Sequence, residues 1–402
     1  TCPMLKLLQI NSTANWGSTG KIAEQIGELA ISKGWESYIA YGRYANKSKS
    51  KLIKIGSKLG MFCHLVESRL FDNHGLASRI ATRQLIKEIK RINPDIIHLH
   101  NIHGYYLNYK ILFNYLNGVD TPVVWTLHDC WAFTGHCAHF IDAECYKWKK
   151  GCKNCPTHRS YPSAYTDQSK RNYQLKNKLF TYKDHIFLAP ASIWLSDFVG
   201  ESYFKGKNRD VFHNGINLNI FKPSKWKQTD KIKIIGVSSI WNKAKGLEDF
   251  YKLHEILDTN KYDITLVGLN QEQKNNLPEG INGILRTNSA EELAELYSNA
   301  NVFVNPTYAD TFPTTNLEAL ACGTPVITYK TGGSPESITP NTGFVVEQGD
   351  IDGIINAIKE IESRGKQYYA DACRKYAEEN FDKDKCFEKY IELYNELLNS
   401  TK

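Results

Sequence analysis

Residues 310–318 (D-T-F-P-T-T-N-L-E) combine two carboxylates with backbone groups able to bind an anion. The apolar run 301–307 precedes them and A-L-A-C-G-T-P-V-I follows, an order that predicts strand, loop, helix and second strand. Asp310 would lie on a loop at a strand's carboxyl end, where open α/β sheets bind ligands. Glu318 would lie one turn into a helix whose first N–H groups attract phosphate. Since carboxylates accept hydrogen bonds from hydroxyls, the stretch predicts a ligand carrying both hydroxyls and phosphate.

A structural interpretation competes for the same residues. Thr315 and Glu318 are spaced as a capping box, in which the glutamate bonds only the backbone N–H of the helix cap. Both roles could hold at once, so this alternative stays open at the level of sequence.

Two further segments between a predicted strand and a predicted helix suit a phosphate ligand. Lys243 and Lys245, in S-S-I-W-N-K-A-K-G at 238–246, could neutralise a departing diphosphate. Surface lysines are the alternative, although cations are disfavoured at a helix N-terminus, which favours a bound anion. The Gly17–Gly20 loop would let the backbone approach a phosphate, or would serve only as a turn.

Histidines gather where two predicted strands end. His128 and Asp129 close the strand 123–128, and His98, His100 and His103 lie in or just after the strand 95–101. Strand alternation puts His98 and His100 on one face. Each histidine taken singly suits a structural hydrogen bond, but the group suits a ligand site at one edge of the sheet.

Four cysteines lie within nineteen residues, spaced C-x7-C-x6-C-x2-C: Cys137, Cys145, Cys152 and Cys155. Four thiolates could hold a structural Zn²⁺ and fix a loop that lacks regular structure. Free reduced thiols, disulfides and an iron–sulfur cluster are the alternatives. Cysteine and histidine side chains nearby could replace a ligand: Cys130, His136, His139 and His158.

The elements that must position these residues alternate between strand and helix. The predicted strands are 5–11, 36–41, 95–101, 123–128, 186–191, 231–239, 262–268, 301–305, 324–329 and 344–346. The predicted helices are 22–32, 80–92, 247–257, 291–299, the helix after 310–315, 351–361 and 383–398. This alternation predicts an α/β protein with parallel sheets.

The length of 402 residues exceeds what one hydrophobic core usually supports, so two domains are expected. A break near 213–223 divides the chain into 1–215, with a cysteine-rich loop at 130–160, and 216–382. Residues 383–402 are expected to pack back on the first domain as a helix. The sequence therefore predicts two doubly wound, Rossmann-like domains facing a cleft.

Charge divides unevenly along the chain. Residues 1–223 carry 30 Lys and Arg against 16 Asp and Glu, and the remainder carries 20 against 27. A basic half predicts an anionic partner, and acidic lipid suits the lysine cluster Lys47, Lys49, Lys51, Lys54 and Lys58. A solvated basic surface without a partner is the alternative for the same lysines. No nucleic-acid-binding module is present, so nucleic acid is not expected. Without an apolar run of membrane length or a signal-peptide core, the expected location is the cytoplasm, including the inner face of its membrane.

These motifs together resemble the family 4 retaining glycosyltransferases of GT-B fold, in particular the bacterial surface-polysaccharide type with a cysteine-rich loop. The resemblance covers nearly the whole chain. It is carried by Gly17–Gly20, His128-Asp129, H-N-G-I-N at 213–217, K-A-K-G at 243–246 and, above all, the acid–x7–Glu pattern of 310–318.

The resemblance implies transfer of a sugar from a nucleotide diphosphate donor, with retention, to a saccharide or lipid-linked saccharide. Glu318 would hold the ribose, Asp310 the sugar hydroxyls, and Lys243 and Lys245 the diphosphate. The loop between the two acids would bind the sugar and pyrophosphate through its backbone N–H groups, of which proline supplies none: Thr311, Phe312, Pro313, Thr314 and Thr315. From the other domain, Gly20 would approach the diphosphate and His128 the reacting centre. The expected catalytic residues are thus His128, Asp310 and Lys245, with no cofactor required for catalysis.

The chain departs from the family pattern at three positions. Asp310 stands where the family usually has Glu, Thr311-Phe312-Pro313 where it often has Gly-Phe-Gly, and Ile240 where it commonly has Arg. Other function classes fit the same scaffold: a nucleotide-sugar epimerase or phosphorylase, or a non-catalytic nucleotide-sugar binding protein.

Overall fold

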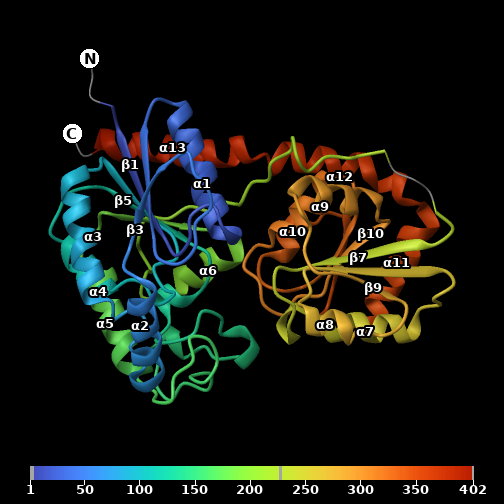
Figure 1. The fold of residues 1–402 in the computed structure, drawn as a ribbon, viewed down its shortest axis with the longest axis horizontal. Coiled ribbons are helices and arrows are strands. Elements are labelled where there is room, and N and C mark those ends of the chain that lie inside the picture. The colour runs from blue at the N-terminus through green and yellow to red at the C-terminus, as the bar shows by residue number, and fades with distance from the viewer. Residues whose placement is uncertain (1–3, 226–228, 401–402) are drawn as a thin grey trace. The chain divides into compact units, whose positions relative to one another are not determined.

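The computed structural model describes residues 4–225 and 229–400. They form two compact units (Figure 1). One contains the described residues up to His213 together with those from Phe387 onward, and the other contains Asn214–Cys386. The sequence prediction placed these boundaries at 215/216 and 382/383. The last helix, α13 (Lys383–Ser400), begins in the second unit and continues into the first.

The first unit is built on a parallel six-stranded sheet of order β3-β2-β1-β4-β5-β6. Its strands are β1 (Lys6–Asn11), β2 (Glu36–Tyr41), β3 (Lys51–Lys54), β4 (Ile96–Leu99), β5 (Val123–Leu127) and β6 (Ile186–Pro190). Its helices, besides the unit's part of α13, are α1 (Gly17–Ser32), α2 (Lys58–Phe71), α3 (Arg79–Ile92), α4 (Tyr109–Leu116), α5 (Ser169–Phe180) and α6 (Ile193–Glu201). Between β5 and α5, the cysteine-rich loop contains only short 3₁₀ turns at Trp131–Phe133, Ile141–Ala143 and Lys147–Lys149.

The second unit repeats this plan with the order β12-β11-β10-β7-β8-β9, again all parallel. Its strands are β7 (Ile232–Val237), β8 (Tyr262–Val267), β9 (Ile281–Ile284), β10 (Val302–Asn305), β11 (Val326–Tyr329) and β12 (Gly343–Val346). Its helices are α7 (Leu247–Ile256), α8 (Gln271–Asn275), α9 (Ala290–Asn299), α10 (Thr314–Ala321), α11 (Ile351–Arg364) and α12 (Lys366–Asn380), with 3₁₀ turns at Lys243–Lys245 and Ser334–Ser337.

Helices cover both faces of each sheet (Figure 1). The central strands are therefore buried throughout, and β4, β5, β10 and β11 contain no exposed residue. Strands buried on both faces read as continuous apolar runs. The apolar runs of these strands could therefore be assigned to parallel sheets from the sequence alone.

Each sheet has the strand order of a Rossmann fold, which confirms the prediction of two doubly wound domains. In that order the chain reverses its direction of growth at one place, between β1 and β4 in the first unit and between β7 and β10 in the second. Ligands of such sheets bind outside the carboxyl ends of those two strands. The topology thus points to the loops after β1, β4, β7 and β10.

The Gly17–Gly20 turn was predicted wrongly. These four residues form the first turn of α1, because Trp16 takes an extended conformation and serves as its N-cap. The prediction also omitted the strands β3 and β9 and the helices α2, α4, α5, α6, α8 and α12. Among the described residues, no helix has the length and apolar character needed to cross a membrane.

Candidate functional site

The loops after β7 and β10 meet in an ion pair between Lys245 and Asp310. Lys245 Nζ lies 2.8 Å from Asp310 Oδ2 and also donates to the carbonyl oxygen of Ala309 at 3.2 Å. The two side chains are 33% and 23% exposed, so a ligand can reach both. A cation and a carboxylate therefore stand together at the reversal point of the second sheet, where topology alone expects a ligand.

The backbone around the pair leaves no room for a side chain at Gly246. This residue follows Lys245 with φ +75°, and an added Cβ would lie 2.2 Å from the carbonyl oxygen of Pro306. The two loops are also joined by a hydrogen bond from Tyr308 N–H to Ala244 O at 2.8 Å. The position of Lys245 is thus fixed by close backbone packing rather than by its own side chain.

A buried carboxylate holds the far side of the β10 loop. Asp249, on α7, accepts hydrogen bonds from Tyr308 Oη at 2.6 Å and Tyr329 Oη at 2.9 Å, and Lys252 Nζ lies 3.0 Å from it. Burial and the bond to Asp249 raise the pKa of Tyr308 to about 12, so the phenol stays a donor. The sequence prediction missed Asp249, for which no local motif gives a signal.

Helix α10 begins two residues earlier than the capping-box interpretation requires. Its N-cap is Pro313, which offers no side-chain cap, so Thr315 lies inside the helix. The actual N-cap has no N–H for Glu318 to bond, and Glu318 Oε2 accepts from Tyr297 Oη at 3.0 Å. The carboxylate is half-buried and held by a buried phenol. The competing structural interpretation of Glu318 is therefore not realised.

The residues between the two acids divide into core and site. The side chain of Phe312 is buried in the core of the unit, so only its backbone can face a ligand. Two buried hydroxyls, Thr311 Oγ1 and Ser334 Oγ, have no hydrogen-bond partner within the described residues. They lie on adjoining segments, since Gly333 N–H donates to Thr311 O at 2.9 Å. Thr314 and Thr315 form the first helical turn, whose N–H groups have no partner inside the helix.

Of the two predicted lysines, only Lys245 contacts Asp310. Lys243 is exposed, as is Ile240 at the position where the family pattern has Arg. The diphosphate role predicted for Lys243 therefore stays a prediction.

In the first unit, Gly20 packs against the loop after β1. A Cβ at Gly20 would lie 2.6 Å from Thr13 Oγ1, and the carbonyl oxygen of Gly20 accepts from Asn15 N–H at 3.0 Å. Packing of α1 on this loop thus requires a residue without a side chain, whether or not a phosphate approaches.

His128 belongs to a chain of hydrogen-bonded histidines. Its Nε2 lies 3.2 Å from His100 Nδ1, and His100 Nε2 lies 2.9 Å from Gln9 Oε1. The rings of His98 and His100 stack with centroids 4.1 Å apart, and His98 Nδ1 lies 2.6 Å from Tyr394 Oη of α13. Burial lowers the pKa of His128 to about 4 and that of His100 well below its usual value. These rings are neutral at pH 7 and act as hydrogen-bonding groups.

Asp129 has a partner of its own. His103 Nε2 lies 2.8 Å from Asp129 Oδ2, and His103 Nδ1 lies 3.1 Å from Tyr161 Oη. Burial opposes ionisation of Asp129, but His103 and the N–H of Trp131 outweigh it and lower the carboxyl pKa to about 2. The histidines predicted at strand ends thus form two separate groups in the first unit.

The four cysteines are free thiols in the cysteine-rich loop. Cys152 Sγ accepts from Gly135 N–H at 3.2 Å, and Cys155 Sγ lies 3.5 Å from Thr157 Oγ1. Burial, followed by the neighbouring cysteines, raises the pKa of Cys137 to about 12. Across residues 4–225 and 229–400, no three His, Cys, Asp or Glu side chains are arranged to hold a metal ion. Zinc ligation by this loop stays a prediction.

Solved structures share this fold over nearly the whole chain. Sucrose-phosphate synthase from Thermosynechococcus elongatus is similar with a TM-score of 0.72 at 16% identity, covering 98% of this chain and 100% of that one. Anabaena HepE in complex with UDP-glucose has a TM-score of 0.63 at 14% identity, covering 98% and 100%. The two doubly wound units are thus those of the GT-B fold of glycosyltransferases.

Residues 219–380 match the family described as Glycosyl transferases group 1. The matched segment contains Lys245, Asp310 and Glu318. WcaC of Escherichia coli (strain K12), whose name describes a glycosyl transferase of colanic acid biosynthesis, is 29% identical over 230 residues, 53% of this chain and 55% of that protein. CapM of Staphylococcus aureus, named as a capsular polysaccharide biosynthesis glycosyltransferase, is 25% identical over 207 residues, 47% and 54%. The chain spans about half the length of these relatives.

Proposed function

We propose that this chain transfers a sugar from a nucleotide diphosphate donor to a saccharide acceptor in surface polysaccharide biosynthesis. The observation that carries the proposal is the Lys245–Asp310 pair at the reversal point of the second sheet, followed by Glu318 on α10. The names of WcaC and CapM support the polysaccharide context. The UDP-glucose bound to HepE supports a nucleotide sugar as donor.

In the proposed reaction, the bond between the anomeric carbon and the diphosphate oxygen breaks, and the leaving oxygen gains negative charge. Lys245 would neutralise that charge, which stabilises the transition state most in a site with little water. Asp310 would accept hydrogen bonds from sugar hydroxyls, and Glu318 from the ribose hydroxyls. The unpartnered hydroxyls of Thr311 and Ser334 are suited to the same polar ligand.

We propose retention at the anomeric carbon. The acceptor oxygen would attack from the face that the diphosphate leaves, and the departing diphosphate would take the acceptor's proton. This scheme needs no covalent side-chain nucleophile, and the one proton that the acceptor loses is taken up by the diphosphate. His128, which is neutral at pH 7, would serve as a hydrogen-bonding group near the reacting sugar rather than as a cation.

A lipid-linked saccharide at the inner face of the cytoplasmic membrane is the acceptor that we propose. The basic balance of residues 1–223 favours an anionic acceptor, and a lipid diphosphate supplies that charge.

The test begins with a thermal-shift panel of nucleotide diphosphates and nucleotide sugars, because a ligand that binds only the folded state raises its melting temperature. The best donor is then incubated with lipid-linked saccharides, and the products are separated. Transfer predicts free nucleoside diphosphate and a heavier acceptor. An isomerised donor would instead indicate an epimerase, and binding without turnover a non-catalytic protein.

A pair of variants separates the site from the fold. Glu318→Gln is expected to abolish turnover while the chain stays folded. Lys330→Ala, which removes an exposed ion pair with Glu347 in the same unit, is expected to leave turnover unchanged.

A further inference from the structure

Helix α2 of the first unit carries its side chains in an inverted arrangement. Its two buried residues, His64 and Ser68, are polar. Four of its apolar side chains point outward at helical spacing, with exposed fractions of 71% for Leu59, 62% for Phe62, 39% for Val66 and 45% for Leu70. Residues three and four apart share one helix face. These four residues are called the α2 stripe below.

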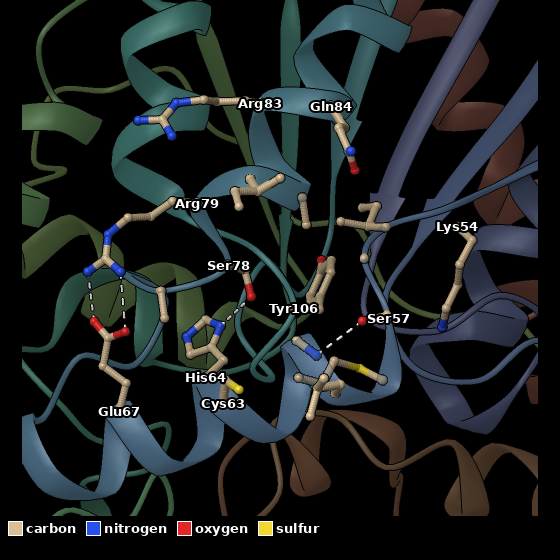
Figure 2. A pocket seen from close by; sticks show the side chains of 18 residues that line it. Lys54, Ser57, Cys63, His64, Glu67, Ser78, Arg79, Arg83, Gln84 and Tyr106 are labelled. Carbon is tan, nitrogen blue, oxygen red and sulfur yellow. Dashed lines mark hydrogen bonds and ion pairs between the residues drawn. The ribbon is translucent and has the colours of Figure 1, made fainter.

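Specific polar contacts fix this orientation. His64 Nδ1 lies 2.8 Å from Ser78 Oγ, and His64 Nε2 accepts from Gly75 N–H at 3.0 Å. Arg79, the first residue of α3, holds Glu67 with two contacts of 2.7 and 3.3 Å. Figure 2 shows both contacts joining α2 to the start of α3. Rotating the helix to bury the α2 stripe would break the contacts of His64 and Glu67, so these contacts keep the stripe facing outward.

The α2 stripe continues into a groove of about 820 Å³. The groove lies between α2, the first turns of α3 and the segment after β3, with Tyr106 among its lining residues (Figure 2). Leu59 of the stripe lines it, as do Cys63 and the exposed Ile80 of α3. A contiguous exposed apolar surface of this kind marks a site of interaction.

Aromatic side chains extend the surface at the other end of α2. Phe71, its last residue, and Tyr165 are both exposed. Tyr165 is placed beside the helix by a hydrogen bond from its N–H to the carbonyl oxygen of Arg69 at 2.7 Å. Tyrosine suits a boundary where one end of the ring is apolar and the other is wet.

The charge around the stripe is positive. Residues 51–83 contain six Lys and Arg against two acids. One acid, Asp72, is buried, and the other, Glu67, is paired with Arg79. Lys58, Arg69 and Arg83 are exposed.

The lysine cluster expected from sequence contributes less free charge than its composition indicates. Lys49 pairs with Glu28 at 3.2 Å, and Lys51 pairs with Glu36. Lys54 Nζ donates to the carbonyl oxygen of Arg43 at 3.0 Å. The cations best placed for an external anion are therefore those beside the α2 stripe.

We propose that the α2 stripe and its groove dock this chain on the surface of an anionic lipid bilayer. An amphipathic helix with an apolar outer face and basic neighbours lies in the headgroup region, with apolar side chains toward the acyl chains and Lys and Arg against lipid phosphates. A second copy is the less suitable occupant, because a two-fold contact would bring two basic rims together. The inference is independent of the proposed sugar transfer.

The test is co-sedimentation of the 402-residue chain with vesicles, in the absence of any nucleotide sugar. Binding is expected to vesicles containing phosphatidylglycerol, to weaken with salt, and to be lost with phosphatidylcholine alone. Phe62→Ser with Val66→Ser is expected to weaken binding about tenfold or more, given the apolar area withdrawn from the lipid. Lys58→Ala with Arg83→Ala is expected to weaken it by about fivefold per charge.

Tyr182→Ser is the matched control, because it removes an exposed ring of the same unit outside this surface and should leave binding unchanged. The stripe variant should keep its melting temperature, since it alters exposed positions, and should keep its thermal shift with donor. Three outcomes would overturn the inference. One is a native protein that fails to bind anionic vesicles, and another is a stripe variant that binds them as well as the native chain does. The third is a native protein that is a dimer without lipid, together with a stripe variant that is a monomer.

Discussion

Replacing Asp310 by Asn tests whether the ion pair between Lys245 and Asp310 serves mainly the stability of the fold or the turnover of the donor. At the 2.8 Å between Lys245 Nζ and Asp310 Oδ2, Coulomb's law in water gives about 1.5 kcal/mol. Solvent screening and side-chain entropy reduce this, because the partners are 33% and 23% exposed, and about 1 kcal/mol or less of stability remains. For a domain of this size the expected fall in melting temperature is about 2–4 °C at most.

The expected effect on turnover is much larger. If Asp310 and Lys245 act on the transferred sugar and its diphosphate, removing one charge from the site costs about 10²–10³ in rate, or roughly 3–4 kcal/mol. The assay is the release of nucleoside diphosphate from the best donor, beside urea unfolding of the same samples. A loss of rate below about fivefold, matching the stability change, would refute the reasoning.

A double-mutant cycle with Lys245→Ala sharpens the result. Two residues in direct contact, as Lys245 and Asp310 are, are expected to lose less activity together than the sum of their separate losses. Fully additive losses would mean that Lys245 and Asp310 act apart, contrary to their contact.

The remaining predictions concern the histidines, the packed loop and the cysteines. Burial holds His98 and His100 neutral, with pKa values well below normal, so the unfolded chain binds more protons than the folded one at low pH. The free energy of unfolding is therefore expected to fall as pH drops below about 6.5. Urea unfolding at pH 7.5 and 5 checks this, and equal free energies at the two pH values would count against it. Gly246→Ala is expected to cost about 1–3 kcal/mol more than Gly206→Ala, since both have positive φ but only Gly246 would place its Cβ 2.2 Å from a carbonyl oxygen; equal unfolding free energies would contradict the packing argument. The zinc hypothesis predicts about one zinc ion per chain by elemental analysis, lost in Cys152→Ser; zinc-free, stable native protein would remove it.

Much of the fold could be predicted because buried parallel strands are continuous apolar runs. The strand predicted at 36–41 is β2 with the same bounds. The short edge strand β3 (K-L-I-K) was missed since its exposed lysines suggest a surface segment. Helix α5 is mostly polar, and α2 turns its apolar face outward, so neither presents the usual core-facing pattern.

The candidate site was predictable in its motifs but not in its contacts. The acid–x7–Glu pattern located Asp310 and Glu318, and the 238–246 segment located Lys245. The contacts themselves carry no local signal, because Lys245 lies 65 residues from Asp310 and Tyr297 lies 21 residues from Glu318. The capping-box interpretation rested on a local spacing. It fails because Pro313, with its fixed φ, already serves as the N-cap.

The first unit can be completed only after the second has been synthesised, because helix α13 supplies part of it. Its Tyr394 and Tyr390 hydrogen-bond His98 and Thr126 in the sheet of the first unit, at 2.6 and 2.8 Å. Domains generally fold as they leave the ribosome, the N-terminal one first. Here the unit that is synthesised first lacks these partners until the second unit, up to Cys386, has been made. The buried histidines of the first sheet are thus covered only after α13 has been made.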